Sequence, residues 1–286
     1  MNLIEFLDKF PSESSCKKHF MNQRMSKGVI CKKCSHDKHY WLQNKEQFEC
    51  KKCKFRTTMR SGTLLHATKL SYRYWYIALH LMTATKKGFS AHEMRRQLGH
   101  KRYEPIWAMM RKIRNYMGRI DDLHQLKGMV ELDDAYLSTY TSQKDKSKLK
   151  RGKGSQKKTK VTVMAESFPL EENQEKSHYV GNFKMKVNKS ETKTATNYVT
   201  QMHIDQDSVI FSDKSSSYKD LDQIFESNPQ KKSKSDDKYE FSWVNIGIAN
   251  VKRFILGIYH VVKEKYLQYY LDEFCYKLVS TPIYPT

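Results

Sequence analysis

The sequence lacks an apolar run long enough to cross a membrane. Its longest apolar stretch, Trp75–Met82, is interrupted by His80, whereas a spanning helix needs about 20 mostly apolar residues. A basic amphipathic helix with a clean apolar face, the kind that lies on a membrane surface, is also missing. These absences exclude a helical membrane-spanning protein and give no support to a membrane partner.

Acidic residues are few relative to basic ones. The 286 residues include 52 Lys and Arg but only 31 Asp and Glu, which gives a formal net charge of +21. Such an excess opposes compaction unless solvent or a polyanion screens it. Nucleic acid is therefore the leading partner, and an anionic membrane surface is its rival.

The N-terminus lacks the uninterrupted apolar core of a signal peptide, because Glu5 and Asp8 fall within it. We therefore expect a cytoplasmic protein, in which disulfides are rare. The chain is long enough for one large domain or two to three small ones.

Four of the six cysteines form two identical pairs. The motif CKKC occurs at Cys31 and Cys34 and again at Cys50 and Cys53, with fifteen residues between the pairs. Two such turns across a hairpin supply the four thiolates of a zinc ribbon, so we expect structural Zn²⁺ and no catalysis at this metal. The alternative is four buried free thiols.

Other residues near the cysteines have simpler interpretations. The aromatic residues Tyr40, Trp41 and Phe48 could supply a small core for the ribbon. For Cys16 and Cys275, which lie outside the pairs, we expect buried or half-buried thiols.

From Ser71 to about Leu126 the apolar pattern is helical, with Gly88 and Gly99 as breaks. The stretch "SAHEMRRQLGHKRYEPIWAMMRKIRNYM" has the plan of a helix-turn-helix. Any basic amphipathic helical hairpin gives this pattern, so a DNA-binding motif and an ordinary solvated hairpin both stay open. The inward residues would be Ile106, Met109, Met110 and Ile113. The basic residues available to DNA would be Arg95, Arg96, Lys101, Arg102, Arg111, Lys112 and Arg114.

The rest of the chain mixes strands and helices. We expect strands at 130–137, 159–168 and 178–188, a helix over 190–203 capped by Ser190, and a short buried strand at 208–213. This order is the one seen at the start of ribonuclease-H-like domains. Later segments are helical, and the last has an apolar stripe made of Leu267, Tyr270, Leu271, Phe274 and Leu278.

Two polar stretches, 141–160 and 228–239, are interpreted as loops. The first contains nine Lys or Arg against one Asp. It could be a solvated connector or a segment that contacts phosphate.

Two adjacent aspartates end the apolar alternation of "VELDDAYL". Side chains alternate along a strand, so Val130, Leu132 and Asp134 share one face, and Glu131 and Asp133 share the other. Because Val130 and Leu132 belong to a packed face, Asp133 is the aspartate that a metal can approach. Asp134 either begins a turn or pairs with a neighbouring base.

A second candidate acid and a possible third position follow later in the chain. Asp213 directly follows a buried strand, so it and Asp133 could hold Mg²⁺ for phosphoryl transfer, although strand-end aspartates are also common turn residues. A late helix offers Asn245 where a nuclease of this fold usually has a third acid. Asn245 and Lys252 are two helical turns apart, so an amide oxygen and a phosphate-binding ammonium share one face.

Together these features resemble the bacterial insertion-sequence transposases related to the eukaryotic Merlin elements. That family combines a zinc ribbon, a helix-turn-helix and a DDE-type ribonuclease-H-like domain. The resemblance covers nearly the whole chain. It rests on the two CKKC pairs, "VELDDAYL", "RGKGSQKKTKVTVMAES", "FSDKSSSY" and "NVKRFILGIYHVVKEKYLQYYLDEFCYKL".

The resemblance implies a multidomain α+β protein. Its expected parts are a helical lead-in (1–27), a zinc ribbon (28–60), a helix-turn-helix-like DNA-binding region (70–126), an α/β ribonuclease-H-like domain with a mixed sheet flanked by helices (127–280) and an atypical tail (281–286).

The family's catalytic positions fall on Asp133, Asp213, Asn245 and Lys252, and part of the family carries Asn in place of the third acid. The resemblance implies Mg²⁺- or Mn²⁺-dependent cleavage at the terminal inverted repeats of an insertion sequence, followed by strand transfer into target DNA. Water is the first nucleophile and the freed 3′-hydroxyl is the second. We expect a dimer or higher oligomer on double-stranded DNA in the bacterial nucleoid, with further DNA contacts at Lys153 and Arg253.

The C-terminus departs from the family pattern. Members usually continue after the "FCYKL" helix with Asn and a pair of arginines, whereas this chain runs "VSTPIYPT". A second hypothesis is therefore an inactive or truncated copy that only binds DNA. A third is an RNA-binding zinc-ribbon protein.

Overall fold

The computed structural model describes residues 1–140, 158–169, 178–188, 190, 192–213, 221, 225–230 and 242–280. The chain divides into two compact units. Unit 1 comprises Met1–Thr85 and Ala91–Ile113, and unit 2 comprises Lys86–Ser90 and Arg114–Thr286. Within the described ranges, every helix is too short or too polar to cross a membrane.

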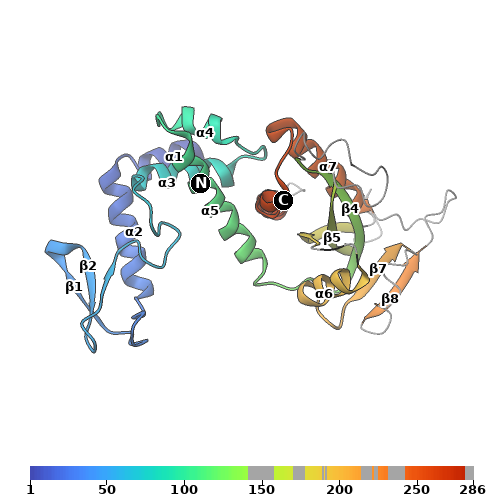
Figure 1. The fold of residues 1–286 in the computed structure, drawn as a ribbon, viewed down its shortest axis with the longest axis horizontal. Coiled ribbons are helices and arrows are strands. Elements are labelled where there is room, and N and C mark those ends of the chain that lie inside the picture. Colours follow the sequence, from blue (N-terminus) through green and yellow to red (C-terminus); the bar gives the residue numbers. More distant parts are fainter. Residues whose placement is uncertain are drawn as a thin grey trace. The chain divides into compact units, whose positions relative to one another are not determined.

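Unit 1 begins with two capped helices, α1 (Leu3–Lys9) and α2 (Glu13–Lys27). The side chains of Asn2 and Ser12 each accept a hydrogen bond from the backbone N–H three residues on, which satisfies a donor that the helix leaves unpaired. Pro11 lies between the helices, where its ring prevents a continuous helix. The stretch expected as a helical lead-in thus forms two helices (Figure 1).

A small antiparallel sheet follows, in the order β1-β2-β3. Its elements are β1 (His39–Leu42), the short 3₁₀ helix η1 (Gln43–Lys45), β2 (Gln47–Cys50) and β3 (Arg56–Thr58). The side chain of Phe48 is buried, and its ring lies 4.8 Å from that of Trp41. Tyr40 is 50% exposed, so its predicted place in this core is wrong. Tyr40 lies instead under the ammonium groups of Lys51 and Lys54.

The helical block contains α3 (Tyr72–Ala84), α4 (Ala91–Gln97) and α5 (Tyr103–Asp121), which confirms the expected helices. The turn after α4 contains Gly99, whose φ of +62° favours glycine. The N–H of Gly99 bonds to the C=O of Arg96 and that of His100 to the C=O of Arg95, the paired bonds of a Schellman stop. The predicted inward residues are all buried: Ile106, Met109, Met110 and Ile113.

Unit 2 is built around a five-stranded sheet of order β6-β5-β4-β7-β8. Its strands are β4 (Met129–Ser138), β5 (Lys158–Pro169), β6 (His178–Val187), β7 (Val209–Asp213) and β8 (Glu226–Gln230). Strands β4, β5 and β6 pair antiparallel in sequence, whereas β7 is parallel to both β4 and β8. This mixed sheet and its helices confirm the predicted α/β ribonuclease-H-like fold, and the chain as a whole has the predicted α+β class.

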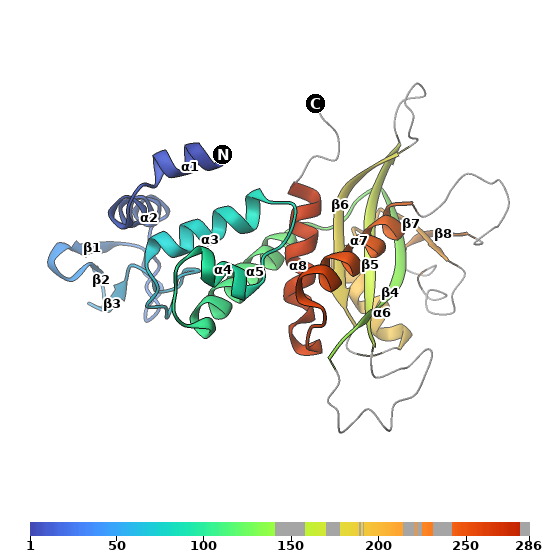
Figure 2. The same ribbon diagram turned by 90° about the horizontal axis from the view of Figure 1, so that it is seen from above.

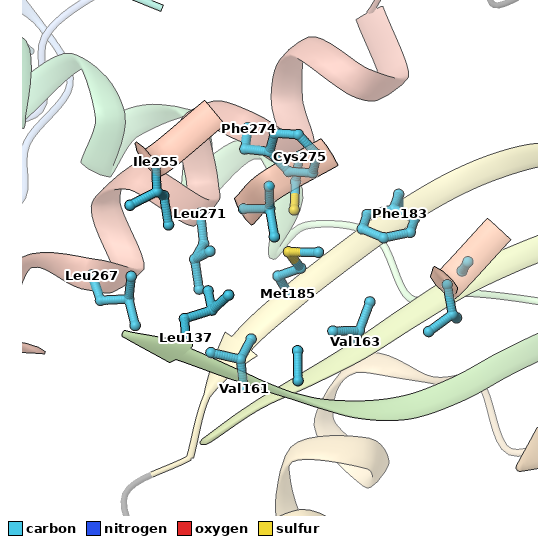
Figure 3. Packing of buried hydrophobic residues seen from close by; sticks show 14 of the residues in the cluster. Leu137, Val161, Val163, Phe183, Met185, Ile255, Leu267, Leu271, Phe274 and Cys275 are labelled. Atoms are coloured by element: carbon cyan, nitrogen blue, oxygen red, sulfur yellow. The ribbon is translucent and has the colours of Figure 1, made fainter. Parts of the chain in front are cut away.

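Helices cover both faces of this sheet: α6 (Lys193–His203), α7 (Ser242–Tyr259) and α8 (Glu264–Ser280). One apolar cluster joins β4, β5 and β6 to α7 and α8, and Figure 3 shows Leu271, Phe274 and Cys275 of α8 among it. A second cluster lies on the opposite face, where Val199 of α6 packs against it. Figure 2 shows the two late helices along one side of the sheet. The predicted apolar stripe of α8 is confirmed, because all five of its residues are buried or packed against the first cluster.

Both outer strands of the sheet have modified edges. On β6, the Gln268 side chain accepts from the N–H of Val187 at 2.8 Å and donates to the C=O of Met185 at 2.9 Å. Among the strands that the structure describes, β8 pairs with β7 alone, and it contains Pro229, which has no N–H to donate.

Three expectations for this region need correction. Residues 228–230 were expected in a loop but belong to β8, and 158–160 belong to β5. The remaining parts of both expected loops, 141–157 and 231–239, lie outside the described residues, as does the tail 281–286. Helix α6 is capped by Thr192 rather than Ser190, because the Thr192 hydroxyl accepts from Ala195 N–H and the Ser190 hydroxyl bonds to that of Thr192.

Candidate functional site

The four paired cysteines meet at one point of unit 1. Their Sγ atoms all lie within 4.8 Å of one another. Three of the separations are 3.3 to 3.6 Å, close to the roughly 3.8 Å that a tetrahedron with Zn–S bonds of about 2.3 Å requires. The four residues therefore fit a structural zinc ion and leave no open corner for a reacting water.

The two CKKC turns have the same backbone geometry. In each turn the C=O of the first cysteine accepts from the N–H four residues later, on Ser35 or Lys54, and both of these residues have a positive φ. The N–H of each first cysteine in turn donates to the C=O of His36 or Phe55. This repeated fold aims all four thiols inward, and it explains why spacing alone predicted the cluster.

The basic residues of α4 and α5 occupy different environments. Arg96, Lys101 and Arg102 are exposed, and Arg95 and Arg111 are half-buried. The Arg111 guanidinium lies over the Trp107 ring, and the Arg96 guanidinium contacts the Glu93 carboxylate. The Lys112 ammonium donates to the C=O of His66. Lys153, a further predicted DNA contact, lies outside the described residues.

Arg114 was expected to be available to DNA, and this expectation is wrong. Its side chain is 2% exposed and belongs to unit 2, where Nε donates to a Glu273 carboxylate oxygen at 2.6 Å. The guanidinium also donates to the Tyr259 hydroxyl and lies over the Tyr270 ring at 4.4 Å. A cation this enclosed is a structural element and cannot reach phosphate.

Strand β4 places the two adjacent aspartates on opposite faces of the sheet, as the alternation predicted. Asp134 lies on the face of Val130 and Leu132, where its carboxylate pairs with the buried Lys160 at 2.9 Å. Of the two roles left open for Asp134, pairing with a base is the one observed, because β4 continues to Ser138 without a turn. Asp133 is half-buried, and its Oδ1 accepts from Asp134 N–H at 2.8 Å.

The face that carries Asp133 is also covered, which the sequence interpretation missed. Ala135 and Leu137 of that face belong to the apolar cluster under α7 and α8. The face that carries Asp133 is therefore packed at the residues that follow Asp133 and is not open along the strand.

Asp213 ends β7, the parallel neighbour of β4. The register between these two strands pairs Leu132 with Ser212, so Asp133 in the middle of β4 and Asp213 at the end of β7 each directly follow the last pair that joins them. The structure thus brings together the backbone positions of the two predicted acids.

Helix α7 carries the other two predicted positions. Asn245 lies in its first turn and Lys252 two turns further on, and both side chains are exposed. Arg253, predicted to contact DNA, is also exposed and bonds to Asn250. The start of α7 is attached to β4, because Glu131 accepts hydrogen bonds from the N–H groups of Trp243 and Val244.

Two protein-family models match this chain and identify its family. The family model of the ISXO2-like transposase domain matches residues 125–278, and the model of the transposase zinc-ribbon domain matches residues 11–56. The chain belongs to the ISXO2-like transposases. No curated protein matches it. The second match agrees with the four-cysteine cluster, and the two together support a zinc-containing, DNA-binding transposase.

The candidate residues of this ISXO2-like transposase fit a divalent cation of the hard type. Carboxylate oxygens at Asp133 and Asp213 and an amide oxygen at Asn245 are the donor types that Mg²⁺ and Mn²⁺ prefer. Two of these residues, Asp133 and Asp213, lie at neighbouring positions on adjacent strands.

A partly buried charged cluster of the transposase domain was not predicted. Lys184 and Lys186 of β6 pair with Asp121, and Lys186 also with Asp122. Burial, with Lys186 and Lys184 nearby, lowers the pKa of His203 to about 4. Burial raises the pKa of Asp272 to about 7. No local motif marks these residues, because they come from four separate elements.

Proposed function

We propose that this protein cleaves DNA at the terminal inverted repeats of its insertion sequence and joins the freed ends to target DNA. The observation that supports the proposal is the register of β4 and β7, in which Leu132 pairs with Ser212, the residues directly before Asp133 and Asp213. The hydrogen bonds from Trp243 and Val244 to Glu131 on β4 support the inclusion of the next residue, Asn245, in the proposed site. The grouping with the Merlin-related members, with Asn in the third position, is part of this proposal.

The proposed roles follow from the chemistry of each side chain. Asp133 and Asp213 bind divalent cations, and Asn245 contributes an amide oxygen to the same site. When bound, Mg²⁺ or Mn²⁺ would stabilise the charge on the phosphate oxygens and lower the pKa of the attacking hydroxyl. Lys252 binds the phosphate beside the scissile bond, and Asp134 holds the Asp133 carboxylate through its N–H.

The proposed DNA surface extends beyond the reacting residues. In unit 1 it comprises Arg95, Arg96, Lys101, Arg102 and Arg111, together with the lysines of the two CKKC motifs, Lys32, Lys33, Lys51 and Lys52. In unit 2 it includes Arg253 and, outside the described residues, Lys153. We propose the division into lead-in, ribbon, helix-turn-helix-like region and catalytic domain given by the sequence, with a dimer or higher oligomer as the form that acts on DNA.

The test uses full-length protein, Mg²⁺ or Mn²⁺, and a duplex that carries the inverted repeats flanking the gene. Wild-type protein should nick and join strands. Asp133→Asn or Asp213→Asn should reduce the rate by about 10³-fold or more while DNA binding persists, because several kcal/mol of transition-state stabilisation disappear and each tenfold is 1.36 kcal/mol.

Asp207→Asn is the matched control, since Asp207 is an exposed aspartate in the turn before β7. It should leave cleavage unchanged. Wild-type inactivity on the correct ends would contradict the proposal. Binding that survives chelation, without cleavage under any divalent metal, would identify a DNA-binding protein only, and equal affinity for unrelated RNA would identify an RNA-binding one.

A further inference from the structure

We infer that Glu131 is a positioning residue that fixes the distance between Asp133 and Asn245. The inference rests on the proposed function, since it takes these two residues as parts of one reaction site. Glu131 lies two residues before Asp133 on the same face of β4, about 7 Å away along the strand at about 3.3 Å per residue. Its carboxylate holds the backbone of the residues that immediately precede Asn245.

The hydrogen bonds of Glu131 are made to residues that support the site. The side chain is 1% exposed, and one carboxylate oxygen accepts from Trp243 N–H at 3.0 Å and from Val244 N–H at 3.1 Å. The carboxylate also has a hydrogen bond with the Ser167 side chain. These amides are among the first N–H groups of α7, which have no partner within the helix.

A carboxylate suits this position for two reasons. It accepts two hydrogen bonds at once, and its negative charge is favourable at the positive end of a helix. The Glu131 side chain is enclosed, so its charged form loses hydration, and the two backbone N–H donors offset part of that loss. Burying a carboxylate is costly because it loses hydration. Its presence here indicates that the geometry it fixes is needed, and an apolar residue would not provide that geometry.

A second contact fixes the other side of Asn245. A Cβ added at Gly247 would lie 2.1 Å from Cζ of Phe183 on β6, so α7 approaches the sheet as closely as only glycine allows. Trp243 and Val244, which precede Asn245, are buried, whereas Asn245 itself is exposed. The helix is therefore held immediately before and after the residue that it presents, and Glu131 provides the hold nearer to Asp133.

The experiment compares Glu131→Ala and Glu131→Gln with Glu166→Ala in the cleavage assay described above. Glu166 is a matched control, because it is 4% exposed, lies on β5 and accepts from the backbone N–H groups of Lys127 and Asn182. Neither of these two donor residues belongs to α7. Glu131→Ala should lower the cleavage rate by about 10²-fold, the effect of misplacing a reacting group by about 1 Å, with DNA binding unchanged.

Glu131→Gln keeps an acceptor oxygen and should restore most of the lost rate, which a residue needed only for its charge would not do. Glu166→Ala should stay close to wild type once the folded fraction is equal. Equal losses in Glu131→Ala and Glu166→Ala would overturn the inference, because both would then reflect general destabilisation.

Two further readouts separate positioning from an independent role. Combining Glu131→Ala with Asn245→Ala should give no greater loss than Asn245→Ala alone, because both changes remove the same contribution. Multiplying losses would overturn the inference. Amide exchange at Trp243 and Val244 should rise in Glu131→Ala and not in Glu166→Ala. A wild-type protein that does not cleave would count against the proposed function, while unchanged exchange would count against Glu131 alone.

Discussion

The cysteine-bearing sheet of unit 1 and the five-stranded sheet of unit 2 are stabilised by different interactions. Strands β1–β3 are three or four residues long, and few large apolar side chains are buried around them. The larger sheet has an apolar cluster on each face. A short segment without a large core usually needs a metal, whereas a sheet packed on both sides does not. One chain thus combines metal-dependent and packing-dependent folding.

The first way to sharpen this contrast is to remove zinc. Structural zinc contributes an apparent binding free energy of about 10–16 kcal/mol in small zinc domains, so a strong chelator should unfold β1–β3. The five-stranded sheet should keep its amide-exchange protection, measured strand by strand. Cys50→Ser should abolish bound zinc, whereas Cys16→Ser, a buried thiol outside the cluster, should retain it. Simultaneous loss of protection in both sheets would refute the contrast.

The second test addresses polar interactions inside unit 2. Arg114→Met leaves the buried Glu273 carboxylate without its guanidinium partner, which should cost about 3–5 kcal/mol of unfolding free energy in urea. Arg119→Met changes an exposed arginine of the same helix and should have little effect. Adding Glu273→Gln to Arg114→Met should recover part of the loss. Equal midpoints for the two single variants would show that the pair does not stabilise unit 2.

The third test uses pH. Burial raises the pKa of Asp272 from 3.8 to about 7, so between these values the folded chain holds a proton that the unfolded chain has lost. The contribution of Asp272 to stability therefore falls as pH rises through this window. Asp272→Asn should be more stable than wild type at pH 8, by at most about 4 kcal/mol at 1.36 kcal/mol per pKa unit, and should lose this advantage near pH 4.

A neighbouring histidine provides the opposite sign. The pKa of His203 is lowered from 6.5 to about 4, so its contribution to stability rises with pH between these values. His203→Gln should therefore remove a rise of stability with pH between about 4 and 6.5, whereas Asp272→Asn removes a fall. Urea midpoints measured across the range distinguish the two variants, and parallel profiles for both would contradict the assignment.

The smallest effect concerns the cap of α6. Thr192→Ala removes the side chain that accepts from Ala195 N–H and should cost about 1 kcal/mol of unfolding free energy. Ser190→Ala should cost much less, because Ser190 contacts only the Thr192 hydroxyl in this cap. Thermal melting of both variants provides the measurement. A larger loss for Ser190→Ala would restore the cap expected from the sequence.

Features encoded by local spacing were predictable. The cysteine cluster depends on two short turns, and the faces of β4 depend on alternation, so both could be read without knowing the fold. Strand β8 could not, because "ESNPQ" is polar and contains Pro229, and such a sequence is tolerated as a strand only at the edge of a sheet.

Features that depend on distant partners were missed. Helical periodicity gives the direction of Arg114 but not the presence of Glu273, which lies 159 residues further along the chain. Glu131 shares a face with Asp133, which was taken as accessible, and only the position of α7 shows that its carboxylate is enclosed. In both cases a charged residue is buried because a specific polar partner from another element reaches it.

The contact of Gln268 with β6 has a consequence for how copies of this protein can associate. Its amide bonds to the Val187 N–H and the Met185 C=O, the groups that a sixth strand would use. The Val187 N–H therefore has no hydrogen bond left to donate. At the opposite edge Pro229 removes a donor altogether. Strand addition between crowded copies is thereby discouraged, which protects against aggregation and leaves side-chain surfaces to build any assembly on DNA.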